Sequence, residues 1–352
     1  MLKYMSVCNY INEYIKSNHL KSGDKLPTEM EIARAVGVSR ITMQKALSEL
    51  IRQNVIYRVQ GSGTYVKNAP KEVSSEVKMI PVVVSHDGIT TRTFDIIRGI
   101  EAFFDTVSYY VTTHNTNMSA DREKDVINQL IGNGFHSMLV LPVDSLENSD
   151  LFFDLVYKRQ LDIVFIDHLP NQLKGNCVES DNVYGGYLAT EHLIDKGYKR
   201  IAVISPQPLE QYSTFGSRTE GCINALKRYG IPFKKEYFKV CSPSFFLREA
   251  AEELMSLPEP PDAIFALNDL EAIDLLHILT DLGYKVPQDV AIVGYDNLEI
   301  LTKQPIPLTS IDQNFYMIGY SAASLLFDLM TATEKKLISH KLPVSLVKRH
   351  ST

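Results

Sequence analysis

The chain has 352 residues, of which 45% are apolar and 22% charged, a composition typical of globular proteins with more than one domain. Its formal net charge of −6, taken alone, disfavours nucleic acid as a partner. The charge is unevenly distributed, however. Residues 1–70 carry ten Lys and Arg against five Asp and Glu, net +5, and the remainder carries 26 against 37, net −11. A basic amino-terminal module on an acidic body is expected when only one part of a protein contacts phosphate.

The four cysteines, Cys8, Cys177, Cys222 and Cys241, form no C-x-x-C pair and have no clustered histidines near them in the sequence. This spacing disfavours zinc and redox motifs and favours reduced, buried thiols. No apolar run after Lys3 predicts a secretory signal, and none approaches the ~18 residues of a membrane helix. We therefore expect a cytoplasmic protein with no metal site, no cofactor and no membrane partner.

Three helices are predicted at the amino-terminal end. Apolar residues recur at helical spacing and predict a first helix over about 2–18. Thr28 is placed to cap a second helix, which ends at Gly37, a residue suited to positive φ. Ser39 is placed to cap a third helix, which runs to about Gln53.

The third helix and the segment after it predict a DNA-binding module. When the apolar positions of this helix face inward, Arg40, Gln44 and Lys45 are left facing outward. Residues 55–59 and 64–66 alternate as strands around a glycine-containing tip. Together these elements predict a winged helix-turn-helix, whose third helix can enter the major groove of DNA.

The rest of the chain predicts an α/β fold. Short apolar strands alternate with helical patterns, an order that predicts parallel sheets with helices on both faces. The expected strands are 80–85, 109–113, 138–142, 163–167, 200–205, 263–267 and 291–295. The expected helices are 94–104, 121–131, 185–196, 218–229, 247–255 and 269–282. The length suits two lobes better than one. We therefore divide the chain into a winged-helix domain (1–67), a flexible linker (68–78) and an α/β domain (79–352).

Polar residues follow several of the expected strands. They are the pairs Ser85-His86, Asp167-His168, Asn268-Asp269 and Asp296-Asn297. In open α/β sheets the ligand crevice lies off the carboxyl ends of the strands. Asn and Asp side chains there suit a hydroxyl-rich ligand, since they can accept hydrogen bonds from hydroxyls and Asn can also donate.

Two motif sets carry a family resemblance. The first is L-P-T-E-M-E-I-A…G-V-S-R-I-T-M-Q-K-A-L…Q-G-S-G-T-Y-V, and it resembles the DNA-binding domain of GntR-family regulators. The second includes V-E-S-D-N-V-Y-G-G, H-L-I-D-K-G-Y-K-R-I-A-V-I, A-I-F-A-L-N-D, V-P-Q-D-V-A-I-V-G-Y-D-N and L-T-S-I-D-Q. It resembles the LacI-type effector domain, a two-lobed relative of periplasmic sugar-binding proteins. The combination resembles the arabinose-repressor subfamily.

The resemblance implies that the third helix enters the major groove and that the wing reaches an adjacent groove. The implied DNA contacts are Thr28, Ser39, Arg40, Thr42, Gln44, Lys45, Arg58, Gln60 and Gly61. Met30 and Gln44 stand where many members of the family carry Arg, which implies fewer phosphate contacts or different base preferences. For the cations among these residues, the alternative is a solvated surface charge.

The same resemblance places a ligand between two lobes. The implied ligand residues are Ser85, His86, Phe94, Asp167, His168, Arg218, Asn268, Asp296 and Gln313. Alternatives stay open for several of them. Asn268 with Glu271 has the pattern of a helix capping box, and Phe94 suits the core. We expect Asp181 to cap a helix rather than to bind ligand. His168 stands where relatives carry Arg, which puts a standard sugar contact in doubt.

The function implied is that of a sugar-responsive repressor, not an enzyme. The sequence has no G-x-G-x-x-G after a strand, no Walker loop, no H-E-x-x-H and no G-x-S-x-G. By resemblance the chain forms a homodimer on a double-stranded DNA operator and binds a monosaccharide, L-arabinose or another aldopentose, with an L-fucose-like deoxyhexose as the near alternative. A sugar-binding protein without a DNA role, and a regulator that uses the sugar as co-repressor or activator, are the alternatives.

Overall fold

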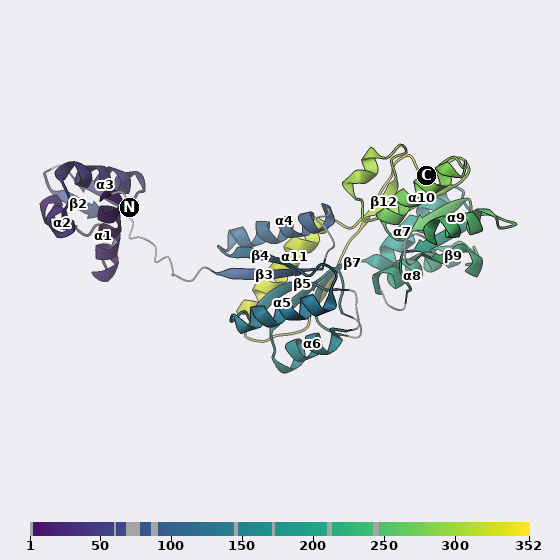
Figure 1. Ribbon diagram of the computed structural model, residues 1–352, viewed down its shortest axis with the longest axis horizontal. Helices are drawn as coiled ribbons and strands as arrows, with labels where there is room; N and C mark the ends of the chain where they lie inside the picture. Colours follow the sequence, from purple (N-terminus) through teal and green to yellow (C-terminus); the bar gives the residue numbers. More distant parts are fainter. Residues whose placement is uncertain are drawn as a thin grey trace. The chain divides into compact units, whose positions relative to one another are not determined.

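The computed structural model in Figure 1 describes residues 3–59, 61–67, 78–85, 91–143, 147–170, 173–209, 213–241 and 246–352. The chain divides into two compact units, Met1–Val77 and Lys78–Thr352. Most of the predicted linker, residues 68–77, lies outside the described residues, as do Gln60 and His86.

The described residues of the amino-terminal unit form three helices and a hairpin. They are α1 (Lys3–Ser17), α2 (Glu29–Val36), α3 (Arg40–Arg52), β1 (Ile56–Val59) and β2 (Gly63–Val66). The two strands pair antiparallel, with Ile56 opposite Val66. One core holds the unit together, built around Ile11, Met43 and Leu50 from two of the helices together with both of these strand residues. The winged helix-turn-helix predicted from the sequence is therefore confirmed.

The predicted caps of this unit are also confirmed. The side chain of Thr28 accepts a hydrogen bond from the backbone N–H of Glu31, and the Glu31 carboxylate accepts one from the backbone N–H of Thr28. This reciprocal capping box fixes where α2 begins. Gly37 ends the helix at a φ of 70°, and the hydroxyl of Ser39 accepts from the N–H of Thr42 to start α3.

The carboxy-terminal unit contains two lobes, each a six-stranded sheet between helices (Figure 1). The first sheet has the order β13-β7-β6-β5-β3-β4, and all its strands are parallel. Its strands are β3 (Met79–Val84), β4 (Tyr110–Asn115), β5 (Ser137–Leu141), β6 (Asp162–Ile166), β7 (Asn176–Ser180) and β13 (Ser339–Leu342). Helices α4 (Thr91–Thr106) and α11 (Phe315–Thr331) pack on one face. Helices α5 (Ala120–Gly132) and α6 (Ser149–Phe153), with the π-helical turn Asp154–Lys158, pack on the other.

The second sheet has the order β14-β12-β11-β10-β8-β9 and is parallel except for the edge strand β14. Its strands are β8 (Ile201–Ser205), β9 (Phe238–Val240), β10 (Ala263–Ala266), β11 (Ala291–Tyr295), β12 (Thr309–Asp312) and β14 (Ser345–Val347). Helices α9 (Leu247–Met255) and α10 (Asp269–Asp281) cover one face. Helices α7 (Asn182–Asp195) and α8 (Ser213–Arg228) cover the other. Short 3₁₀ turns lie at Lys235–Tyr237 and Glu299–Lys303.

In the part of the chain that the structure describes, the backbone passes between the two lobes three times. It crosses from β7 to α7, from β12 back to α11, and from β13 to β14. The sequence predicted a two-lobed α/β fold, which the structure confirms, but it did not predict these crossings. Helix α11 and strands β7, β9, β12, β13 and β14 were not among the expected elements. No helix of the described residues is both long and apolar enough to cross a membrane.

Candidate functional site

A group of buried polar and charged residues lies where the strands of the two lobes end. Asp167 follows β6 of the first lobe. Asp296 follows β11 of the second lobe, and Gln313 follows β12 at a crossing between the lobes. All three are buried. The parallel strands therefore bring these polar side chains to the carboxyl edges of the sheets, as the rule for open α/β folds predicts.

Asp167 is only 4% exposed and is held by a cation of its own lobe. Its Oδ2 lies 2.7 Å from Nη2 of Arg92, in the first turn of α4, and 3.6 Å from Nδ1 of His168. The backbone of Asp167 has a φ of 72°, a conformation that costs non-glycine residues energy and clusters at ligand sites. The surrounding structure thus holds this carboxylate in a fixed place.

Arg218 of α8 is the corresponding cation of the second lobe and is 3% exposed. Its Nε donates to Oδ1 of Asn182 at 2.9 Å, and its Nη1 donates to the carbonyl of Leu267 at 2.6 Å. Its Nη2 lies 3.7 Å from Oδ1 of Asp296. The guanidinium also stacks on the ring of Tyr295, 3.8 Å from the ring centroid. These partners fix the plane of the guanidinium before any ligand arrives.

Glycines on α7 and α8 allow the two helices to bring Arg218 this close. A Cβ on Gly186 would lie 1.9 Å from the backbone oxygen of Arg218, and one on Gly221 would lie 1.9 Å from that of Val183. Only glycine permits such an approach of two helix backbones. The position of Arg218 therefore depends on residues that carry no functional group themselves.

The two carboxyls respond differently to burial. Burial acts to raise the pKa of Asp167, but Arg92, the hydrogen bond with His168 and the charge of Arg218 outweigh it and hold that pKa well below its ordinary value. Burial also acts on Asp296, and there it prevails: the pKa is raised, although Arg218 and Arg92 oppose the rise. Each carboxyl is thus influenced by both arginines, so the four groups form one cluster across the two lobes.

Several buried acceptors of this cluster have no hydrogen-bond partner among the described residues. They include Oδ1 of Asp167 and Oε1 of Gln313, and the hydroxyl of Tyr295 is also without a partner there. Gln313 donates from Nε2 to Oδ1 of Asp296 at 2.5 Å, which leaves its own oxygen facing away from that bond. Buried acceptors without donors are costly, so a ligand that carries hydroxyl donors would satisfy them.

The structure brings some of the other predicted ligand residues to this cluster and not others. Asn268 follows Leu267, and its Oδ1 accepts from the N–H of Glu271 to cap α10, so its NH₂ is the part that can serve a ligand. Ser85 is half-buried at the end of β3, with its hydroxyl 3.2 Å from Sδ of Met118.

Phe94 lies on the same helix as Arg92. It is 55% exposed, and it lies two residues after Arg92, which places it about 200° around α4 from that residue. The alternative of a core position does not fit this exposure, and the expected ligand contact of Phe94 stays a prediction. The predicted cap at Asp181 is confirmed, since its Oδ1 accepts from the N–H of Tyr184.

Sequence reasoning missed Arg92, Asn182 and Tyr295. The turn after the first strand was expected to contribute, but through Ser85, His86 and Phe94. The signal that could have identified Arg92 is weak: an arginine in the first turn of a helix that follows a strand. Helix periodicity does not show which face of that turn lies toward the cluster. The orientation of α4 depends on its packing against α11, which is more than 200 residues later in the sequence.

The amino-terminal unit exposes its candidate DNA contacts instead of burying them. Arg40, Gln44 and Lys45 of α3 are exposed and Thr42 is half-buried. Nζ of Lys45 lies 4.8 Å from the ring centroid of Tyr4. Gly61, at the wing tip, is exposed with a φ of 75°.

The remaining candidates of this unit already have partners. Arg58 forms an ion pair with Glu29 at the start of α2. The side chains of Thr28 and Ser39 cap helices. A phosphate contact through Arg58 would have to compete with that ion pair.

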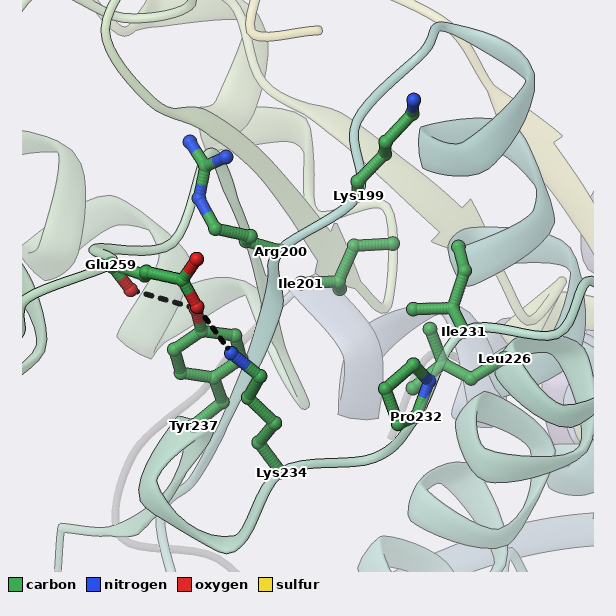
Figure 2. A pocket seen from close by; sticks show the side chains of 9 residues that line it. All are labelled: Lys199, Arg200, Ile201, Leu226, Ile231, Pro232, Lys234, Tyr237 and Glu259. Carbon is green, nitrogen blue, oxygen red and sulfur yellow. Dashed lines mark hydrogen bonds and ion pairs between the residues drawn. The ribbon is translucent and has the colours of Figure 1, made fainter.

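Figure 2 shows a separate pocket of about 210 Å³ in the second lobe, lined by Lys199, Arg200 and Lys234 among others. It lies beside Ile201, at the amino-terminal end of β8, and so at the opposite end of that strand from the cluster. Nε of Arg200 donates to the carbonyl of Pro260 at 2.6 Å, and Nζ of Lys234 donates to Glu259 at 2.7 Å. Since the side chains of Arg200 and Lys234 are already bonded, this pocket is a poorer ligand site than the cluster with its unpartnered acceptors.

Comparison with known proteins matches both units. Residues 3–66 match the family described as bacterial regulatory proteins, gntR family, and residues 190–352 match a periplasmic binding protein-like domain. The arabinose metabolism transcriptional repressor of Geobacillus stearothermophilus is 30% identical over 341 residues, covering 93% of this chain and 91% of the relative. The HTH-type transcriptional repressor CytR of Escherichia coli is 29% identical over 345 residues, covering 94% and 98%. A solved LacI family transcriptional regulator from Enterococcus faecium with bound ribose matches with a TM-score of 0.64 and 26% identity, over 77% of this chain and 98% of that one.

Proposed function

Since the chain belongs to the GntR family of bacterial transcriptional regulators and carries a periplasmic-binding-protein-like second domain, we propose that it represses carbohydrate-utilisation genes and leaves its operator when a monosaccharide binds. We assign residues 1–67 to DNA binding, 68–78 to a linker and 79–352 to sugar binding and dimerisation. A regulator of this kind works in the cytoplasm, where bacterial DNA is.

The DNA half of the proposal rests on α3. In a winged helix-turn-helix this helix reads bases in the major groove, and its amino-terminal residues reach the base edges. Arg40 is its first residue, is exposed, and can donate two hydrogen bonds to one guanine. The proposed contacts are Thr28, Ser39, Arg40, Thr42, Gln44, Lys45, Arg58, Gln60 and Gly61. Thr28 and Ser39 would act through the helix N-termini that they cap, where backbone N–H groups attract phosphate.

The effector half rests above all on two ion pairs, Arg92 with Asp167 in one lobe and Arg218 with Asp296 in the other, whose charges act on each other's carboxyls. Together their charges nearly balance, so a neutral ligand with several hydroxyls suits them better than an anion. Charge-assisted hydrogen bonds to hydroxyls are short and directional, which allows one sugar to be distinguished from another. The proposed ligand residues are Ser85, His86, Phe94, Asp167, His168, Arg218, Asn268, Asp296 and Gln313.

The proposed effector is an aldopentose, with L-arabinose first. Two similarities favour it: the relative from Geobacillus stearothermophilus is an arabinose metabolism repressor, and the regulator from Enterococcus faecium holds ribose. An L-fucose-like deoxyhexose is the near alternative, because it too is a neutral monosaccharide with several ring hydroxyls.

The proposed mechanism couples the two functions through a homodimer. One small winged helix gives limited specificity, so two chains would place two such modules on a pseudo-palindromic operator. Sugar would draw the two lobes together, since its hydroxyls bond to carboxylates from both. The sugar weakens DNA binding only to the extent that it prefers the closed, operator-released form.

A thermal-shift panel tests the effector half. We expect L-arabinose or another monosaccharide to raise the melting temperature of the full chain, because a ligand that binds only the native state stabilises it. Asp296→Asn should abolish most of that rise. If the stabilisation by the sugar is the same in Asp296→Asn as in the wild type, Asp296 is not part of the site.

A further inference from the structure

We propose that Arg92 is a positioning residue of the effector site, which holds one oxygen of Asp167 so that the other is presented to a sugar hydroxyl. This inference rests on the proposed function. It adds a residue that neither the sequence motifs nor the proposed contacts include, and a division of labour between the two oxygens of one carboxylate.

The first support is the way Arg92 is held. Its guanidinium lies 5.5 Å from the ring centroid of Phe315, the first residue of α11, and its Nη2 lies 2.7 Å from Oδ2 of Asp167. The arginine comes from α4 and the carboxylate from the end of β6, so three elements of the first lobe converge on this ion pair. The Arg92 side chain is 32% exposed and that of Asp167 is 5% exposed. The cation therefore lies nearer to solvent than the carboxylate that it holds.

The second support is the unequal use of the two oxygens. A bidentate arginine would occupy both oxygens of a carboxylate. Here the hydrogen bond from Arg92 and the contact from Nδ1 of His168 both go to Oδ2. Oδ1 is buried and has no partner among the described residues. A negatively charged oxygen that is kept dry and unbonded is suited to accept a strong hydrogen bond from a ligand.

The third support is that Arg92 acts on the other lobe as well. Burial raises the pKa of Asp296, and the charge of Arg92, after that of Arg218, opposes the rise. Arg92 therefore interacts with the carboxyls of both lobes. A residue so placed favours the ionised form of both carboxyls.

A simpler role for Arg92 would be to neutralise a buried charge and nothing more. In that case its loss would lower the stability of the protein but would act on sugar affinity independently of Asp167. A positioning role requires instead that the two residues act as a unit, which a double-mutant cycle measures.

The test is isothermal titration of the full chain with L-arabinose, and with D-ribose, D-xylose and L-fucose in the same way. Arg92→Gln should raise the dissociation constant of whichever sugar binds by about ten- to a hundredfold, the range for a lost hydrogen bond to a charged group. Arg92→Lys should recover part of the loss, because it keeps the charge without the planar fork. In an Asp167→Asn background, Arg92→Gln should change the dissociation constant by less than about twofold.

The matched control is Arg159→Gln. Arg159 forms an ion pair with Asp154 of 2.8 Å in the same lobe, but at the surface, and should leave the dissociation constant of the sugar unchanged. If Arg92→Gln does not fold, as judged by circular dichroism, Arg92→Lys takes its place in the cycle.

An unchanged dissociation constant in the Arg92 variant, or an equal factor in both backgrounds, would overturn the inference while leaving the proposed function intact. A wild-type chain that binds none of the four sugars would overturn the proposed effector class and the inference with it.

Discussion

The two units of this chain use cations in opposite ways. In the winged helix Arg40 and Lys45 are exposed to water, whereas in the effector unit Arg218 is buried and held by three polar groups and an aromatic ring. DNA carries its own high charge density, so an exposed cation gains affinity by releasing counterions from phosphate. A neutral sugar offers no such gain and must displace water from polar groups that are already fixed in place. Arginine is therefore solvent-exposed in the unit proposed to contact DNA and buried in the unit proposed to bind sugar.

The largest expected effect concerns the buried cation Arg218. Arg218→Met keeps an apolar stem over Tyr295 but leaves Asn182 and Asp296 without the guanidinium. Removing one partner of a buried ion pair costs ~3–5 kcal/mol. We expect the free energy of unfolding, measured with urea, to fall by about that amount, and the stabilisation by sugar to disappear.

The control is Arg248→Met on α9, whose partners Asp281 and Glu252 lie at 3.0 and 4.0 Å on an exposed surface. Exposed ion pairs contribute ~0–1 kcal/mol, so this variant should remain close to the wild type. Equal losses of unfolding free energy in the two variants would contradict the distinction between exposed and buried cations.

The second effect concerns pH. Burial raises the pKa of Glu271, in the first turn of α10, to about 7 from 4.5, and its Oε2 has no partner within the described residues. The native state therefore holds a proton that the unfolded chain releases, so the stability contributed by that proton is present below about pH 4.5 and is lost as the pH rises through about 7.

Glu271→Gln removes this ionisation. We expect the variant to be more stable than the wild type at pH 8, by at most ~3 kcal/mol on the basis of ~1.4 kcal/mol per pKa unit. The difference should shrink as the pH is lowered to 5. The measurement is the melting temperature of both proteins across that pH range. A difference that does not change with pH would show that Glu271 does not titrate in the native state.

The smallest expected effect concerns the exposed cation Arg40 of the winged helix. Arg40→Ala should weaken specific DNA binding by ~1–3 kcal/mol, relax discrimination at one base pair and leave the thermal shift by sugar unchanged. Fluorescence anisotropy with operator DNA at several salt concentrations measures it. Arg52→Ala, at the other end of α3 and already paired with Glu49 at 2.6 Å, is the control and should leave affinity near the wild-type value. If the two variants weaken binding equally, α3 does not dock through its amino-terminal end.

The sequence predicted those parts of the structure that depend on neighbouring residues. The caps at Thr28, Ser39 and Asp181 follow from local hydrogen bonds within three residues, and all are present. The strand ends at Asp167 and Asp296 were visible because buried strands are apolar throughout and a polar residue marks where each one stops.

Other parts depend on long-range contacts and could not be predicted in this way. Helix α11 belongs to the first lobe although its sequence follows the second, and its Phe315 lies against the guanidinium of Arg92. Phe94 was expected in the crevice or the core, and its 55% exposure excludes the core. No local pattern carries such information, because it arises when segments more than 200 residues apart pack together.

The central claim is that a sugar bound to the second unit controls the affinity of the first unit for DNA. Fluorescence anisotropy of the full chain on labelled duplexes from the promoter region next to its own gene, titrated with each of the four sugars, tests it most directly. The account predicts tight, salt-dependent binding that one of these sugars reverses in the wild type and fails to reverse in Asp296→Asn. DNA binding that none of the sugars alters, or no binding to any of these duplexes, would contradict it.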